Sequence, residues 1–340
     1  MRVIYIDIDS GRPDHLGCYG YHRATSPNID QLARESVRFT NVYTSDAPCL
    51  PSRTALFGGR LGLHSGVNGH GGTAARVRYP GEGHTTDPER LPLPMALSRA
   101  GIKTVTFTTF AQRHLAWHFY AGWDEVHKPN NKNGNETADE VNAAVLPWLE
   151  ANGKQDNYFL HVNYWDPHTP YRTPLGFGNP FANEPPPEWP TQEVLDAQWA
   201  SYGMHGAHDK PPHSTAQYPR TPAQLRTRAD YHRWIDGYDC GVRFADEHIG
   251  QLIQTLDRLG VLDETAIIVS ADHGEAQGEL NVYGDHQCAD QATYNVPLLI
   301  RWPGVSAPRR YDGLMYQLDL APTVCELLGV PAPARWDGRS

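Results

Sequence analysis

Cys49 lies in the segment DAPCLPSRTALFGGR (46–60), two residues before Pro51 and four before Arg53. Proline suits the first turn of a helix, so the segment predicts a helix that opens at Pro51, with Cys49 just before it. The thiol would then lie near the free N–H groups and the positive dipole end of that helix, within reach of Arg53. The pattern predicts a nucleophile beside an anion pocket, and a buried thiol that happens to precede a helix is the alternative.

Polar residues also end three strand-like runs of the chain. Asp9 and Ser10 follow RVIYIDI, His168 follows FLHVNYW, and Asp272 and His273 follow AIIVSA. In open α/β sheets ligands bind at the carboxyl ends of the strands, so residues at these positions are expected to meet. Carboxylate oxygens suit Ca²⁺, Mg²⁺ or Mn²⁺, and an added imidazole also suits Zn²⁺. The sequence predicts a divalent-metal site on Asp9, Asp272 and His273, although a single Asp taken alone is more typical of a helix cap or a solvated strand end.

Histidines near these positions are candidates for proton transfer. His168 lies in DPHTPY, His286 follows Asp285 in YGDHQ, and His114 follows Arg113 in FAQRHLAW. An imidazole titrates near neutral pH, so each of them suits a general acid or base. The chain has 17 histidines, and most must be ordinary surface or core residues. We favour function for His168 and His286, and for His114 the functional and structural interpretations stay open.

Strand-like and helical runs alternate along the chain, which is typical of an α/β domain with a largely parallel sheet and helices on both faces. The strands are predicted at 2–9, 102–109, 157–165, 265–272 and 295–302. The helices are predicted at 26–36, 51–59, 94–101, 136–153, within 222–259 and at 317–329. The stretch at about 174–222 is rich in Pro, Trp, His and Gly and shows no period. It is predicted to be an irregular insertion near the site, with an ordinary surface loop as the alternative.

The composition of the chain argues against a nucleic-acid-binding protein and against a membrane-spanning one. The chain of 340 residues has a formal net charge of −10, which argues against a nucleic-acid partner but allows a small anionic substrate. No run of 18 apolar residues is present, so no membrane span is expected. The first nine residues read as a strand, not as a signal peptide, and the five cysteines are widely spaced. These features predict free thiols and a cytoplasmic location.

Three segments carry a resemblance that covers nearly the whole chain. They are DSGRPDHLGCYGYHRATSPNIDQLARESVRFTNVYT (9–44), CLPSRTALFGGR (49–60), and VSADHGEAQGELNVYGDHQ (269–287) followed by YNVPLLIRWPG. In this order they resemble the formylglycine-dependent sulfatases of the alkaline-phosphatase superfamily. The resemblance implies an alkaline-phosphatase-like fold, with a large, mixed, mostly parallel sheet in one catalytic domain over 1–340. The chain stops where family members enter a smaller C-terminal subdomain, so that subdomain is expected to be absent or truncated.

The resemblance also implies a mechanism for hydrolysing a sulfate ester. The motif cysteine is oxidised to formylglycine by a maturation enzyme, and one hydroxyl of the hydrated aldehyde attacks sulfur. The second hydroxyl then lets the aldehyde reform as sulfate leaves, which a serine could not do. The implied substrate is a small-molecule or saccharide sulfate ester, and the implied metal is a divalent ion, most often Ca²⁺.

Site residues follow from the resemblance position by position. The implied metal ligands are Asp9, Ser10, modified Cys49, Asp272 and His273. The implied catalytic residues are Cys49, Arg53, His114, His168 and His286. The implied substrate-binding residues are Arg113, His168 and Asp285, with Arg113 and His114 in place of the family's Lys-x-His element.

Two positions depart from the family pattern. Asp285 stands where many members carry lysine before histidine, and Ser10 stands where many sulfatases carry a second Asp. Related members with a non-acidic residue at the second position include phosphonate and phosphodiester hydrolases. A phosphonate monoester or phosphodiester hydrolase is therefore the first alternative. A non-catalytic relative that binds a sulfated ligand is the second, and a convertible cysteine argues against it.

Overall fold

The computed structural model describes residues 1–78, 91–208 and 216–340. Its centre is an eight-stranded sheet in the order β4-β3-β5-β1-β6-β7-β2-β8. Strand β7 is antiparallel to both of its neighbours, and the other pairs are parallel, so the predicted mixed, mostly parallel sheet is confirmed. The strands are β1 (Arg2–Ile8), β2 (Val37–Tyr43), β3 (Lys103–Phe107), β4 (Glu125–His127), β5 (Tyr158–Tyr164), β6 (Thr265–Ala271), β7 (Leu298–Arg301) and β8 (Arg309–Tyr316).

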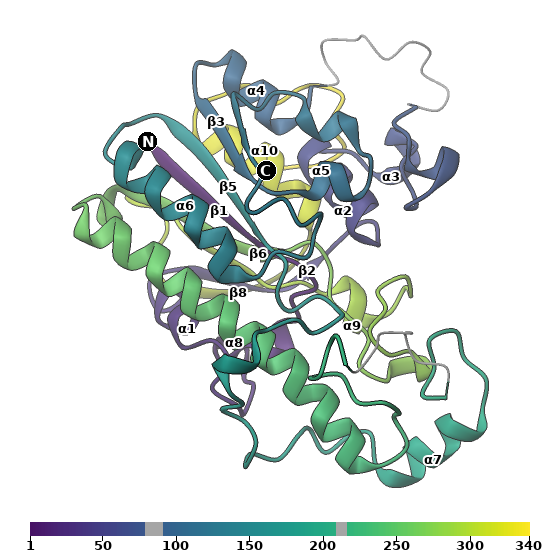
Figure 1. The fold of residues 1–340 in the computed structure, drawn as a ribbon. Helices are drawn as coiled ribbons and strands as arrows, with labels where there is room; N and C mark the ends of the chain where they lie inside the picture. The colour runs from purple at the N-terminus through teal and green to yellow at the C-terminus, as the bar shows by residue number, and fades with distance from the viewer. Residues whose placement is uncertain (79–90, 209–215) are drawn as a thin grey trace.

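Helices cover both faces of this sheet (Figure 1). One face packs against α1 (Pro27–Ala33), α6 (Ala138–Asn152) and α8 (Arg228–Arg258). The other packs against α2 (Cys49–Gly58), α4 (Leu93–Arg99), α5 (Phe110–Arg113) and α10 (Leu320–Leu327). The remaining α-helices of the described ranges are α3 (Gly62–Ser65), α7 (Gln192–Ala200) and α9 (Gln291–Tyr294). No helix in these ranges is both long and apolar enough to cross a lipid bilayer.

Strand β1 shows why functional groups gather on the α2 side of the sheet. Ile4 and Ile6 belong to the core under α1, α6 and α8, whereas Val3 and Tyr5 belong to the core under α2. Side chains alternate between the two faces of a strand, so Asp7 continues the second set. Every residue of β1 is buried, as expected for a central parallel strand, and a carboxylate at this depth requires a partner.

Two predicted boundaries differ from the structure. Helix α2 begins at Cys49 and not at Pro51, because the Ser52 N–H already donates to the Pro48 carbonyl at 3.1 Å. The insertion at about 174–222 contains helix α7, whose first turn is capped by the Thr191 hydroxyl. This helix was not predicted, because its sequence is polar and shows no clear apolar period. Strands β2, β4 and β8 were not predicted, because β4 has three residues and the exposed β8 lacks an apolar alternation.

Candidate active site

Cys49 lies at the centre of a buried cluster of polar side chains. Its Sγ is 3.0 Å from Nε2 of His273 and 3.7 Å from Nε2 of His286. One donor atom from each of Asp9, Cys49, Asp272 and His273 lies within 4.8 Å of the others. Asp9 follows β1, while Asp272 and His273 follow β6, so the carboxyl ends of two parallel strands meet the start of α2. The structure thus brings together four of the five predicted metal ligands.

Arg53, one turn into α2, neutralises the carboxylates of this cluster. Its Nε lies 2.7 Å from Asp7, and its Nη1 lies 2.9 Å from Asp9 and 2.6 Å from Asp272. All four side chains are fully buried, and the guanidinium also lies 4.6 Å from the centre of the Phe110 ring. The role of Asp7 was missed in the sequence analysis, although a carboxylate inside an otherwise apolar strand is the signal that identifies it.

The electrostatics of the cluster follow from burial and from charge. Burial alone would raise the pKa of Asp9, but Arg53 and the nearby histidines lower it below its usual range. Burial raises the pKa of Asp272 despite Arg53, and the neighbouring Asp9 raises it further. Burial and these two carboxylates also raise the pKa of the Cys49 thiol. Without a further cation the thiol is therefore protonated at neutral pH, and a protonated thiol is a poor nucleophile.

The donor set fits a divalent cation. Oδ1 of Asp7 and Oδ2 of Asp272 are buried and receive no hydrogen bond, although Arg53 lies close to both residues. Nδ1 of His273 lies 2.7 Å from the Gly274 carbonyl, which leaves Nε2 free to act as a ligand on the Cys49 side. Two carboxylates and one imidazole next to residue 49 are a set that Ca²⁺, Mg²⁺, Mn²⁺ or Zn²⁺ accepts.

Ser10 touches this cluster through hydrogen bonds. Its hydroxyl donates to Asp9 at 3.2 Å, and its backbone N–H donates to Oδ1 of Asp272 at 3.2 Å. The residue has a positive φ of 60°, which is an uncommon conformation for serine. Ser10, the fifth predicted ligand, therefore lies beside Asp9 and Asp272 and orients both carboxylates.

His168 and His286 lie next to His273, and all three rings are buried. The rings of His273 and His286 stack at 4.2 Å, and the His168 ring meets His286 edge-on at 5.0 Å. Nε2 of His168 is 4.0 Å from Asp9. Burial lowers the pKa of His273 to about 4 and of His286 to about 3, and it lowers that of His168 well below its usual range. All three are neutral near pH 7, so each offers a ring nitrogen that can accept a hydrogen bond or ligate a metal.

Three other predicted site residues, His114, Asp285 and Arg113, differ in their contacts with this cluster. His114 follows α5, and one donor atom from each of Cys49, His70 and His114 lies within 4.8 Å of the others. Nε2 of His114 is buried and unpartnered, and burial lowers its pKa to about 2. It contacts His70, which sequence reasoning missed because the surrounding NGHGG has no pattern. Asp285 is predicted to bind substrate, but its carboxylate is already used: it accepts from the His286 N–H at 2.7 Å and pairs with His205 at 2.6 Å. Arg113 contacts Trp165 and a carbonyl, as described below.

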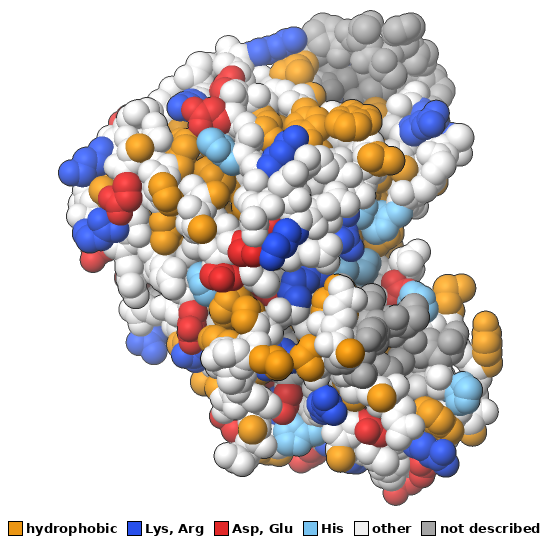
Figure 2. Space-filling view, in the orientation of Figure 1, with side chains coloured by type: hydrophobic (Ala, Val, Ile, Leu, Met, Phe, Trp, Pro, Cys, Tyr) orange, Lys and Arg blue, Asp and Glu red, His pale blue; other side chains and the backbone are white. Residues whose placement is uncertain are grey.

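Figure 2 shows this face of the molecule hollowed on its right side, between the part that carries α3 and α5 and the part that carries α7 and α9. Histidine and cationic side chains gather along the hollow. A substrate approaching there would meet imidazoles and guanidinium groups, although the chain as a whole is acidic.

Known proteins resemble this chain in sequence and in fold. The sulfatase family model matches residues 2–330. Iduronate 2-sulfatase of Mus musculus is 26% identical, with 98% of this chain and 70% of that protein covered. Arylsulfatase A of Homo sapiens is 28% identical, with 98% and 65% covered. The chain therefore spans about two thirds of the length of these relatives.

Solved structures agree on the fold. A protein in complex with its substrate D-glucosamine-2-N,6-O-disulfate superposes with a TM-score of 0.78 at 19% identity, covering 100% of this chain and 78% of that one. The phosphonate monoester hydrolase of Agrobacterium radiobacter gives 0.74 at 21% identity, covering 100% and 76%. These likenesses support the alkaline-phosphatase-like fold. With the family match over nearly its whole length, the chain belongs to the sulfatase family.

Proposed function

We propose that this protein hydrolyses a sulfate ester of a small molecule or a saccharide. The observation that carries the proposal is the buried cluster of Asp9, Cys49, Asp272 and His273 at the start of α2. A binding module has no need for a convertible cysteine among metal-type ligands. Curated relatives named as sulfatases support the same reaction class.

We further propose that a maturation enzyme oxidises Cys49 to formylglycine. The raised pKa of the unmodified thiol supports this, because a protonated, buried sulfur is badly suited to attack an anionic ester. A side chain with oxygen in place of sulfur suits the carboxylate-rich cluster better. Arg53 would orient residue 49 and the carboxylates.

A divalent metal ion, with Ca²⁺ as our first expectation, completes the proposed site. Asp9, Asp272, His273 and residue 49 would bind it, and Ser10 would orient the two carboxylates. Such an ion supplies positive charge for the anionic ester and its transition state. His168 and His286, neutral and close to Cys49, would take the proton from the nucleophile and pass it to the leaving oxygen.

The alternative substrate is a phosphonate monoester or a phosphodiester. Asp285 favours this alternative, because it stands at the position of the family's usual lysine. Its carboxylate pairs with His205, so the site lacks the positive charge that the lysine would supply. The cellular location stays a proposal. A reducing compartment such as the cytoplasm suits five cysteines that are all free.

Mass spectrometry of the tryptic peptide 39–53 tests the modification. Conversion of Cys49 to formylglycine lowers the peptide mass by about 18 Da. Hydrolysis of 4-nitrophenyl sulfate and of a phosphonate monoester should then be compared in the same preparation, with Cys49→Ala as the inactive control. Faster turnover of the sulfate supports the proposal, and faster turnover of the phosphonate supports the alternative. A converted protein that hydrolyses neither would refute the proposed activity.

A further inference from the structure

Two arginines from different segments meet beside the candidate active site. Arg113 is the last residue of α5, and Arg172 lies in the segment that follows β5. Their Nη1 atoms both donate to the carbonyl oxygen of Gly134, at 3.3 Å for Arg113 and 3.1 Å for Arg172. One carbonyl therefore fixes two like charges side by side.

No carboxylate of the described residues forms a salt bridge with this pair, although the buried Asp166 carboxylate acts on Arg172 from a longer distance. Among the residues that the structure describes, neither guanidinium forms a salt bridge, and Nε and Nη2 of Arg172 are buried without any hydrogen-bond partner. Arg53, by contrast, has three carboxylate partners. Charged groups at this depth are normally paired, and an unpaired donor loses its hydration without compensation. The pair is therefore short of one negatively charged partner.

The loop around Gly134 is built to hold the two arginines in place. Gly134 has a φ of 84°, and its N–H bonds to the side chains of Thr109 and Glu136 at 2.9 and 3.0 Å. A Cβ on Gly134 would lie 2.4 Å from Cδ of Arg113, so only glycine allows this approach. The guanidinium of Arg113 also lies 5.3 Å from the centre of the buried Trp165 ring. This is a fixed position and not a freely moving surface arginine.

The pair lies next to the reacting groups but outside them. Trp165 has the Arg113 guanidinium at 5.3 Å and the Arg53 guanidinium at 5.9 Å from its ring centre, so the ring connects the pair to the metal-type cluster. Arg113 is close enough to lower the pKa of both the Cys49 thiol and His168, and Arg172 lowers the pKa of His168 and of Asp166. An anion bound by the pair would thus lie beside the group attached at residue 49.

We propose that Arg113 and Arg172 bind a second anionic group of the substrate, a carboxylate or another sulfate, next to the ester that is cleaved. The proposal rests on the proposed function and makes it narrower: the preferred substrates carry at least two negative charges. Guanidinium groups suit this task because their planar N–H donors bind carboxylate and sulfate oxygens in pairs.

Matched substrates that differ by one anionic group test the proposal. One pair is N-acetylglucosamine 6-sulfate and glucosamine 2-N,6-O-disulfate; the other is 4-nitrophenyl sulfate and its analogues with a carboxylate ortho or meta to the ester. The kcat/KM ratio within each pair should be measured for the wild type and for Arg172→Gln. Calorimetric Kd values on the Cys49→Ala background give the same ratio without turnover.

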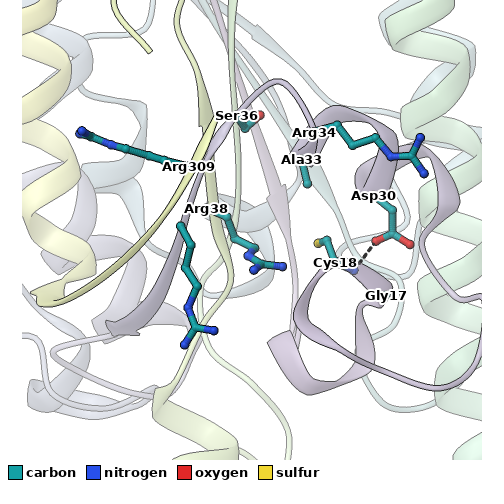
Figure 3. Close-up of a pocket in the computed structure, with 9 residues that line it drawn as sticks. Gly17, Cys18, Asp30, Ala33, Arg34, Ser36, Arg38 and Arg309 are labelled. Atoms are coloured by element: carbon teal, nitrogen blue, oxygen red, sulfur yellow. Dashed lines mark hydrogen bonds between the residues drawn. The ribbon is translucent and has the colours of Figure 1, made fainter. Parts of the chain in front are cut away.

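A separate group of arginines supplies a charge-matched control. Arg34 and Arg309 line a pocket of about 420 Å³ between α1 and the starts of β2 and β8. Figure 3 shows their guanidinium groups pointing to opposite sides of that pocket, away from Cys18 at its centre. Strand β2 runs from this pocket toward the segment before Cys49, roughly 20 Å away. Arg34→Gln therefore removes one positive charge far from the site, as Arg172→Gln does near it.

The wild type should prefer the more anionic member of at least one pair by about tenfold or more, since two charge-assisted contacts are added. Arg172→Gln should bring that ratio to within about twofold, and Arg34→Gln should leave it unchanged. The proposal is wrong if the wild type shows no preference, if Arg172→Gln lowers both members equally, or if Arg34→Gln has the same effect. If nothing is hydrolysed, the proposed function fails, and the Kd ratios still decide on the second anion.

Discussion

Replacing Arg53 by lysine should make the folded state depend on a divalent cation. The wild-type guanidinium contacts three buried carboxylates through two nitrogen atoms, at 2.7, 2.9 and 2.6 Å. A lysine ammonium is a single point on a shorter chain and reaches one of them. Two carboxylates then stay buried without a cation, which is the situation that destabilises proteins most strongly.

The expected size of the effect follows from the contacts. Each charge-assisted contact contributes about 1.5–3 kcal/mol, and two of the three contacts are lost. Breaking a buried ion pair by removing one partner typically costs about 3–5 kcal/mol, so Arg53→Lys should lower the free energy of unfolding by about that amount without added metal. Ca²⁺ at a hundred times its Kd stabilises a protein by about 2.7 kcal/mol. The variant site is more negative, so the same Ca²⁺ concentration should stabilise it more than the wild type.

Urea denaturation followed by tryptophan fluorescence measures both effects, once with a chelator and once with millimolar Ca²⁺. Arg23→Lys is the control, because Arg23 is also fully buried and pairs with Asp236 and Asp239 at 2.9 and 2.8 Å. It should lose stability without any recovery in Ca²⁺. If Ca²⁺ shifts the wild type and both variants equally, Arg53 is not balancing a metal site and the electrostatic reasoning is refuted.

Three further outcomes are expected. Cys49→Ser, incubated with a sulfate-ester substrate, should accumulate a covalent ester that adds about 80 Da to peptide 39–53, because serine has no second hydroxyl to expel sulfate; an unchanged mass after incubation contradicts the proposed nucleophile. Gly274→Ala should weaken Ca²⁺ binding at least tenfold, since its Cβ would lie 1.9 Å from a backbone oxygen and the shift must move His273; calorimetry that finds an unchanged Kd contradicts this. Burial raises the pKa of Glu125, but bonds to Lys103, His127 and Trp148 outweigh it and lower the pKa to about 2. Because the folded pKa lies below the unfolded value of 4.5, this stabilisation is complete above about pH 4.5 and is lost as the pH falls toward 2. Glu125→Gln should therefore cost about 1–2 kcal/mol at pH 7 and much less near pH 2; a loss that does not change with pH contradicts the assignment.

The metal-type cluster could be predicted from the sequence because it depends on regular structure. Asp9 and Asp272 end strands whose apolar runs are unmistakable, and parallel strands bring their carboxyl ends to one edge. Cys49 and Arg53 are one turn apart, which fixes their relation once a helix forms. The same regularity identifies Asp7 in retrospect, since alternation within β1 places it on the side of the sheet that faces α2.

The second part of the site depends on irregular chain: the family resemblance implied Arg113 as a substrate-binding residue, but nothing in the sequence pointed to Arg172 or to Gly134. Gly134 approaches Arg113 only because several residues of its loop, Asn133 among them, adopt positive φ. Arg172 is placed beside Arg113 only because both side chains donate to the Gly134 carbonyl. Gly134 is 38 residues away from Arg172 in the sequence. No periodic pattern in the sequence predicts such a contact, because the position of a single backbone oxygen is set by the folded loop as a whole.

The charge balance of the site predicts which anions it accepts. With a divalent ion bound, Arg53 and the ion together balance the carboxylates of Asp7, Asp9 and Asp272, and the buried histidines add no charge near pH 7. The two arginines held by Gly134 then have no carboxylate of the described residues in direct contact, since Asp166 acts on Arg172 only from a distance, so the site favours a ligand with more than one negative charge. A sulfate monoester supplies one, and a second anionic group on the same molecule supplies the other.

A phosphate monoester supplies nearly two charges by itself, but both lie on the group at residue 49 and neither lies beside Arg172. We therefore expect 4-nitrophenyl phosphate to bind the Cys49→Ala protein more weakly than a carboxylated aryl sulfate does, although the total charges are similar. Arg172→Gln should weaken binding of the carboxylated sulfate and leave that of the phosphate within about twofold. If Arg172→Gln weakens the binding of both ligands alike, the site responds only to the total charge of the ligand. The two arginines then do not distinguish where on the ligand that charge lies.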